Sequence, residues 1–168
     1  MSRWSPPQQR GSNYITAKGF ETLSLENKSL WEKRREVTLA VTAAAAEGDR
    51  SENAEYIYRK KQLREIDRRL RYLQKRLSEL KVVDRLPDNP DRVYFGAWVT
   101  VIDNHGTEHC YRIVGADEFD SDNSYISMDS PVARALLNKG LDDEVQINLP
   151  NNQRVLTIIA IHYTNPRK

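Results

Sequence analysis

The chain has 168 residues, a length typical of one large or two small domains, and its 7 Gly and 7 Pro argue against a fibrous or low-complexity protein. Its single cysteine, Cys110, cannot form an internal disulfide, which favours a reducing, cytoplasmic location. Apolar runs such as residues 155–161 are far shorter than the ~20 residues needed to span a bilayer. We therefore expect neither a disulfide-rich secreted protein nor a membrane-spanning one.

The formal net charge of +2 hides a division along the chain. Residues 1–83 carry 18 Lys and Arg against 11 Asp and Glu, whereas residues 84–168 carry 8 against 13. Such an asymmetry predicts different partners for the two halves, with a polyanion for the first and a basic or apolar protein surface for the second.

Residues 1–13 contain Pro6, Pro7 and Gly11 and have no hydrophobic periodicity. Trp4 is their only aromatic side chain. This composition predicts a mobile N-terminal tail.

Two heptad patterns then predict two long helices. The first begins after Thr16, a candidate N-cap, and its apolar or small positions are Phe20, Leu23, Leu30, Val37, Val41 and Ala44. The second has Tyr56, Leu63, Ile66, Leu70, Leu73, Leu77 and Leu80. Each helix should bury one such seam.

The connection between these helices is predicted to be short, Glu47-Gly48-Asp49. A connection of this length makes consecutive helices antiparallel neighbours, so residues 14–83 should form a coiled-coil hairpin. With arms of about 30 residues at ~1.5 Å each, the hairpin should reach roughly 45 Å, with Gly48 and Asp49 at its far end.

The pattern changes after Val83. Residues 84–91 contain Pro87 and Pro90 and predict a linker. In residues 92–168, strands are expected at 94–102 and 110–114 around a turn at 103–106, and again at 125–128, 144–149 and 154–163. A short helix is expected at 132–138, with Ser130 as N-cap, Pro131 at its first position and Gly140 ending it. The fold class is therefore α+β: a helical hairpin, then a mainly antiparallel sheet with one short helix.

The tip sequence is the most specific motif. Residues 48–56 read Gly-Asp-Arg-Ser-Glu-Asn-Ala-Glu-Tyr, and here the chain resembles the bacterial Gre transcript-cleavage factors, most closely the GreB type. The match continues in the same order from residue 14 to the C-terminus, through residues 60–61, 63–69, 95–99, 112–115 and 129–137. The first 13 residues lie outside the pattern.

This resemblance implies a function and a fold. The hairpin would enter the secondary channel of bacterial RNA polymerase, and the C-terminal domain, similar to the FK506-binding-protein fold, would dock on the channel rim. Asp49 and Glu52 would hold a Mg²⁺ ion beside the polymerase's own metal and so stimulate cleavage of backtracked RNA, with Ser51 and Asn53 in support. Two-metal sites need ions ~3.5–4 Å apart, and Mg²⁺ is often held by one or two carboxylates plus water. The factor would be a monomer and no enzyme by itself.

A structural interpretation of the tip stays open beside the functional one. Asp49 followed three positions later by Glu52 is also typical of a capping box at the start of the second helix. Ser51 and Asn53 would then be polar residues of its first turn.

The second helix is strongly basic, with Arg59, Lys60, Lys61, Arg64, Arg68, Arg69, Arg71, Lys75 and Arg76. These residues would form a solvated coiled-coil face in the structural interpretation. In the functional one Lys60, Lys61, Arg64, Arg68 and Arg71 lie along one flank and hold the displaced 3′ RNA through its phosphates.

Asp129, Ser130 and Pro131 also admit two roles. Locally they are a helix start, and the resemblance implies that they belong to the polymerase-docking surface.

Two other functions stay as alternatives: a channel-binding regulator of polymerase without cleavage activity, and a peptidyl-prolyl isomerase, suggested by the expected C-terminal fold alone.

Overall fold

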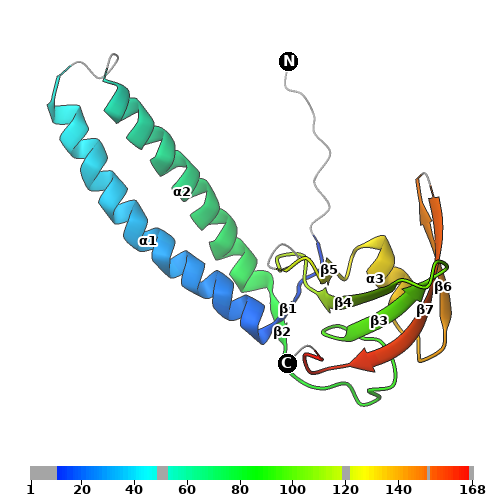
Figure 1. Ribbon diagram of the computed structural model, residues 1–168. Helices are drawn as coiled ribbons and strands as arrows, with labels where there is room; N and C mark the ends of the chain where they lie inside the picture. The colour runs from blue at the N-terminus through cyan, green and yellow to red at the C-terminus, as the bar shows by residue number, and fades with distance from the viewer. Residues whose placement is uncertain (1–10, 49–52, 119–121, 151, 167–168) are drawn as a thin grey trace, which may run out of the picture. The chain divides into compact units, whose positions relative to one another are not determined.

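The computed structural model describes residues 11–48, 53–118, 122–150 and 152–166 (Figure 1). The chain divides into two compact units. One is the segment Lys18–Leu80, and the other combines the described residues of Met1–Ala17 and Lys81–Lys168. Within the described part of the chain, no helix is both long and apolar enough to cross a membrane.

The first unit is the predicted antiparallel helical hairpin. Helix α1 spans Ala17–Ala46 and α2 spans Ala54–Glu79, and the two run side by side (Figure 1). The core between them contains buried Val37, Ile66 and Leu70, with Leu30, Val41 and Leu63 packed against it. Leu23, Ala44 and Leu73 are buried as well. Every apolar residue that the two helices bury belongs to a predicted seam, whereas seam residues such as Phe20, Tyr56 and Leu77 are only partly buried.

Two ion pairs also join the arms. The Arg34 Nε atom lies 2.6 Å from Asp67 Oδ1, and the Arg69 guanidinium makes two hydrogen bonds to Glu26, of 2.7 and 2.9 Å. Both pairs are partly exposed, so each stabilises the hairpin by only about 0–1 kcal/mol. Arg76, expected on the solvated face, is instead buried, with 5% of its surface exposed.

The connection between the helices differs from the prediction. It comprises residues 47–53, because α1 ends at Ala46 and α2 begins only at Ala54. The helix start is fixed by Asn53, whose side chain accepts a hydrogen bond from the Tyr56 backbone N–H. The predicted turn of three residues was therefore too short, although the antiparallel arrangement is as expected.

The second unit contains a five-stranded sheet of order β5-β4-β3-β7-β6 (Figure 1). Its strands are β3 (Trp98–Asp103), β4 (Glu108–Val114), β5 (Tyr125–Ser127), β6 (Glu144–Leu149) and β7 (Asn152–His162). Only the β4–β5 pair is parallel among these neighbours. The mainly antiparallel sheet is as predicted, except that β3 begins at Trp98, since Tyr94 and Ala97 close a turn with a hydrogen bond of 3.2 Å.

Helix α3 (Pro131–Leu136) packs against β5 and β6 and completes the core of this unit. The core contains Val93, Ala97, Val99, Val101, Ile113, Ala133, Leu136, Val145, Ile147, Leu156 and Ile158. Ser130 caps α3 as predicted, by accepting from the Ala133 N–H. The left-handed residue after the helix is Asn138, at φ 64°, and not Gly140. Asn tolerates this conformation, and the Asn138 N–H donates to the Val93 carbonyl.

A two-stranded parallel sheet was not predicted. Strand β1 (Tyr14–Thr16) pairs with β2 (Lys81–Val83), and both belong to the second unit. The hairpin unit is accordingly Lys18–Leu80, shorter at both ends than the predicted range 14–83. The predicted tail is shorter too, because Asn13 accepts a hydrogen bond from the Lys81 N–H.

The buried side chain of Glu118 holds β1 in place. Its carboxylate accepts hydrogen bonds from the Thr16 backbone N–H and the Gly115 N–H, each 3.0 Å long, and from the Thr16 hydroxyl. Thr16 immediately precedes α1, the position predicted for it, and it is also the last residue of β1, where it is bound to a carboxylate that lies 102 positions away.

Candidate functional site

The predicted acidic tip lies mostly outside the described residues. Asp49, Ser51 and Glu52 belong to that undescribed part of the chain, whereas Asn53 is described. The Asn53 Oδ1 atom accepts from the Tyr56 N–H at 3.0 Å, and its Nδ2 donates to the Ala44 carbonyl at 2.9 Å. Asn53 was predicted as a supporting or first-turn residue, and it is in fact the N-cap of α2.

This cap assignment decides one of the two interpretations of the tip. An N-cap residue immediately precedes the helix, and that position is occupied by Asn53. Asp49 is four positions earlier in the chain, so it is not the N-cap of α2 and the predicted capping box of Asp49 and Glu52 is wrong.

The predicted basic row lies on α2. Lys60, Lys61, Arg64, Arg68 and Arg71 are all exposed. At about 100° per residue these five positions occupy one sector of the helix surface, opposite the buried Ile66, Leu70 and Leu73. The row therefore faces away from α1.

The charges of this row are largely unpaired within the described part of the chain. Lys61, Arg64, Arg68 and Arg71 form no ion pair with a described residue. Lys60 contacts only the Tyr56 side chain, with its Nζ 3.4 Å from the hydroxyl. Arg59 and Arg69, outside the row, are paired with Glu55 and Glu26. An exposed row of uncompensated cations attracts a polyanion.

The predicted docking residues form the start of α3. Pro131 is exposed at the first helical position and Ser130 is its cap. Asp129 is half-buried, and its Oδ2 accepts a 2.7 Å hydrogen bond from the Ser12 N–H. Asp129 therefore has a structural contact that the sequence could not reveal, because Ser12 lies 117 positions away and in the predicted tail.

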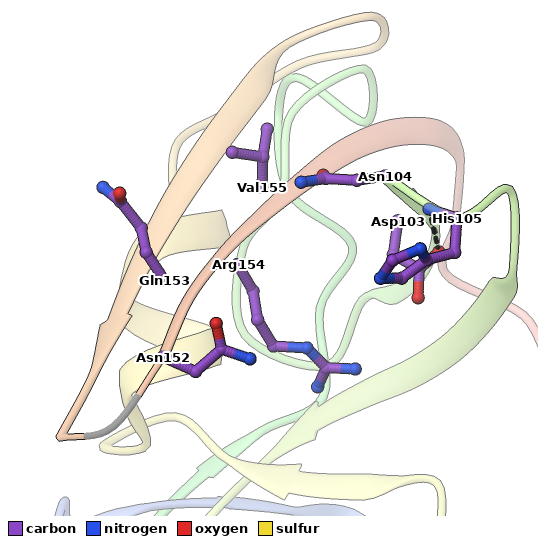
Figure 2. Close-up of a pocket in the computed structure, with 7 residues that line it drawn as sticks. All are labelled: Asp103, Asn104, His105, Asn152, Gln153, Arg154 and Val155. Atoms are coloured by element: carbon purple, nitrogen blue, oxygen red, sulfur yellow. Dashed lines mark hydrogen bonds between the residues drawn. The ribbon is translucent and has the colours of Figure 1, made fainter.

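A polar pocket of about 300 Å³ lies between the β3–β4 turn, residues 103–105, and residues 152–155 of β7. Figure 2 shows Arg154 extending between these two segments. Hydrogen bonds from the Thr107 backbone, from His109 and from the His105 backbone lower the pKa of Asp103. The described residues that line this pocket are polar apart from Val155, unlike the predominantly apolar lining typical of small-molecule sites.

Within the described residues, no group of three or more His, Cys, Asp or Glu side chains is arranged to hold a metal ion. The predicted Mg²⁺ ligands, Asp49 and Glu52, were outside that search, since they lie among the undescribed residues.

Two family models match nearly the whole chain. Residues 13–82 match the N-terminal model of transcription elongation factors GreA/GreB, and residues 87–163 match the C-terminal model of the same family.

Individual relatives agree with the family models. Transcription elongation factor GreB of Pseudomonas aeruginosa is 54% identical over 164 residues, which cover 97% of this chain and 98% of that protein. The GreB of Xanthomonas axonopodis pv. citri is 52% identical over 167 residues, covering 98% and 99% of the two chains. Among solved structures, GreA factor homolog 1 of Thermus thermophilus aligns with 89% of this chain and 97% of its own, with a TM-score of 0.41 and 22% identity. From the two family models and these identities, we conclude that the chain belongs to the GreA/GreB family of transcription elongation factors.

Proposed function

We propose that this elongation factor binds bacterial RNA polymerase, inserts its hairpin into the secondary channel and stimulates endonucleolytic cleavage of backtracked RNA, so that arrested complexes resume elongation. The supporting observation is the N-cap of α2. Because Asn53 caps this helix, Asp49 and Glu52 are acidic residues at the hairpin tip without that structural task.

The chemistry of these two side chains suits the proposed role. Carboxylate oxygens are preferred ligands of Mg²⁺, which commonly binds through one or two carboxylates while it keeps several waters. When bound, the ion would supply an activated water beside the polymerase's own metal. Asp49 and Glu52 would hold this ion, and Ser51 would support them by hydrogen bonding. Two carboxylates are no complete active site, so the factor would have no cleavage activity without polymerase.

Asn53 would position the acidic residues in this proposal. Its side chain bonds both to the last turn of α1, at Ala44, and to the first turn of α2, at Tyr56. One residue thus fixes the distance between the two helix ends that carry the tip, and a site held by rigid elements keeps its ligands in place better than a free loop does.

The basic row of α2 would hold the extruded RNA. Its exposed cations, unpaired with described residues except for the Lys60–Tyr56 contact, suit the phosphates of a single strand, without sequence preference.

The start of α3, with exposed Pro131, would dock on the channel rim. The factor would act as a monomer in the cytoplasm.

The test is the cleavage rate of a defined backtracked polymerase complex with the Asp49→Asn protein. This change removes the charge and keeps a side chain of the same size, so we expect cleavage to fall on the order of 10²-fold, the typical cost of losing one preorganised electrostatic group. Higher Mg²⁺ should partly restore the rate, because a weakened site is refilled by mass action.

The matched control is Glu47→Gln, which removes one charge from an exposed residue of the same connection. It should leave the cleavage rate unchanged. Normal cleavage by a folded, polymerase-bound Asp49→Asn protein would contradict the metal-holding role. Absence of stimulated cleavage by the unchanged protein would instead favour a channel regulator without cleavage activity.

A further inference from the structure

Two exposed tyrosines lie beside the basic row on α2. Tyr58 has 57% of its surface exposed and Tyr72 has 45%. Their spacing of two heptads places both rings on one stripe of the helix, next to the sector that carries Lys61 and Arg68. Neither tyrosine belongs to the buried seam, so core packing does not account for them.

An arginine lies against each ring. The Arg59 guanidinium is 5.6 Å from the centre of the Tyr58 ring, and that of Arg69 is 5.2 Å from the centre of the Tyr72 ring. Both arginines are themselves fixed by carboxylates, Arg59 by Glu55 and Arg69 by Glu26. A cation over a ring is attracted to its π face, so these contacts hold the rings in defined orientations at the surface.

We propose that Tyr58 and Tyr72 are base-stacking platforms for the extruded single strand of RNA, whose phosphates follow the basic row. This inference rests on the proposed function. Proteins that bind single strands without reading sequence combine a track of cations for the backbone with aromatic rings on which bases stack. The two neighbouring stripes of α2 supply these two elements.

Glu65 sets the orientation of the strand. It is exposed and lies midway between Tyr58 and Tyr72 on the same stripe. A carboxylate repels phosphate, so the backbone is excluded from the tyrosine stripe and kept on the side of Arg64 and Arg68. The uncharged base faces then turn toward the rings.

The spacing of the rings predicts a dependence on RNA length. Two heptads of helix at ~1.5 Å per residue separate the tyrosines by roughly 21 Å, with Tyr58 nearer the tip. A stacked strand that rises ~3.4 Å per nucleotide needs about six nucleotides to cover that distance. RNA that passes the tip therefore reaches Tyr58 first and Tyr72 about six nucleotides later.

The experiment uses the full-length protein on polymerase complexes backtracked by stepwise increasing lengths. For Tyr72→Leu, the factor concentration needed for half-maximal cleavage should rise about 5-fold to 150-fold, the range for loss of one base–aromatic stack, but only on the longer RNAs. Tyr58→Leu should raise the same concentration already on RNAs about six nucleotides shorter than those on which Tyr72→Leu has its effect. Tyr72→Phe should match the unchanged protein, because the ring is kept.

Trp31→Leu is the control. Trp31 is exposed on α1 and also has an arginine, Arg34, 5.8 Å from its ring, so it shares the geometry but not the basic row of α2. Replacement of Trp31 should leave the factor concentration for half-maximal cleavage unchanged at every RNA length. In a second experiment, an abasic nucleotide is placed opposite Tyr72. It should weaken cleavage by the unchanged protein as much as Tyr72→Leu does, and it should cause no further loss in the Tyr72→Leu protein.

The outcomes separate the stacking role from the proposed function. If both Leu variants cleave all RNA lengths normally, or if Tyr72→Phe loses as much as Tyr72→Leu, the stacking role is overturned. The Asp49→Asn result is unaffected in either case, because it is read on short backtracked RNA that does not reach Tyr72.

Discussion

Asn53 and Ala44 join the two arms of the hairpin where the tip begins. The Nδ2 atom of Asn53 donates to the Ala44 carbonyl at 2.9 Å, and that carbonyl belongs to the last turn of α1. The other end of the same amide accepts from the Tyr56 N–H in the first turn of α2. A single side chain thus satisfies backbone groups that both helix ends leave without intrahelical partners.

Replacement of Asn53 should separate its two roles. Asn53→Ala removes both hydrogen bonds and should destabilise the hairpin by about 1–2 kcal/mol, the usual range for loss of an N-cap. Asn53→Asp keeps the acceptor for Tyr56 but loses the donor to Ala44, so it should cost about 1 kcal/mol. Hydrogen exchange of the backbone amides at the start of α2 measures both effects.

Gln74→Ala is the control for this series, since Gln74 is exposed in the C-terminal part of α2, far from Tyr56. It should not accelerate exchange at Tyr56. If Asn53→Ala and Asn53→Asp destabilise the hairpin equally, the bond to the Tyr56 N–H contributes nothing. If Asn53→Asp does not destabilise the hairpin at all, the bond to the Ala44 carbonyl contributes nothing.

The basic row should govern the response to RNA length and salt. Lys61→Glu, Arg64→Glu and Arg68→Glu should weaken cleavage of long backtracked RNA more than that of short RNA, because only long extrusions reach these residues. Each lost phosphate contact should reduce the slope of log affinity against log salt concentration by about 0.7. The slope is measured by titrating the factor onto long-backtracked complexes at several salt concentrations.

Lys28→Glu makes the same charge change at an exposed residue of α1 and should leave the length dependence unaltered. The RNA-contacting role of the row is untenable if the three reversals weaken cleavage of short and long RNA equally.

The docking role of α3 is best tested at Pro131. Its side chain is exposed, so Pro131→Arg should lower the affinity for polymerase while the isolated protein stays folded. A saturating concentration of factor should then restore the cleavage rate. If saturation does not restore it, Pro131 acts on something other than docking.

Asp129→Arg is expected to behave differently. The Asp129 carboxylate accepts the hydrogen bond from the Ser12 N–H, and a bond to a charged group contributes about 1.5–3 kcal/mol. Loss of this hydrogen bond should loosen the chain around Ser12, so the backbone amides there should exchange hydrogen faster. Any loss of affinity for polymerase would come in addition. Pro131→Arg should leave that exchange rate unchanged.

The sequence by itself determined the features that local periodicity and capping chemistry encode. The seams of Val37, Ile66 and Leu70 repeat at heptad spacing, and burial of an apolar stripe is how two such helices pair. Ser130 and Pro131 began α3 as predicted, because their preference for a helix start is a property of these residues and their nearest neighbours. The tip motif likewise identified the family before any fold was known.

Only the tertiary structure decided contacts between residues that are distant in sequence. Nothing local distinguishes Asn53 from Asp49 as the cap of α2, and the choice depends on the Ala44 carbonyl, which the antiparallel arm brings within reach. Strands β1 and β2 have three residues each, too few for a period to be recognised, and the carboxylate that bonds to Thr16 of β1 belongs to Glu118, 102 positions away. The Ser12–Asp129 bond likewise exists only because folding has already brought together two segments that the sequence keeps far apart.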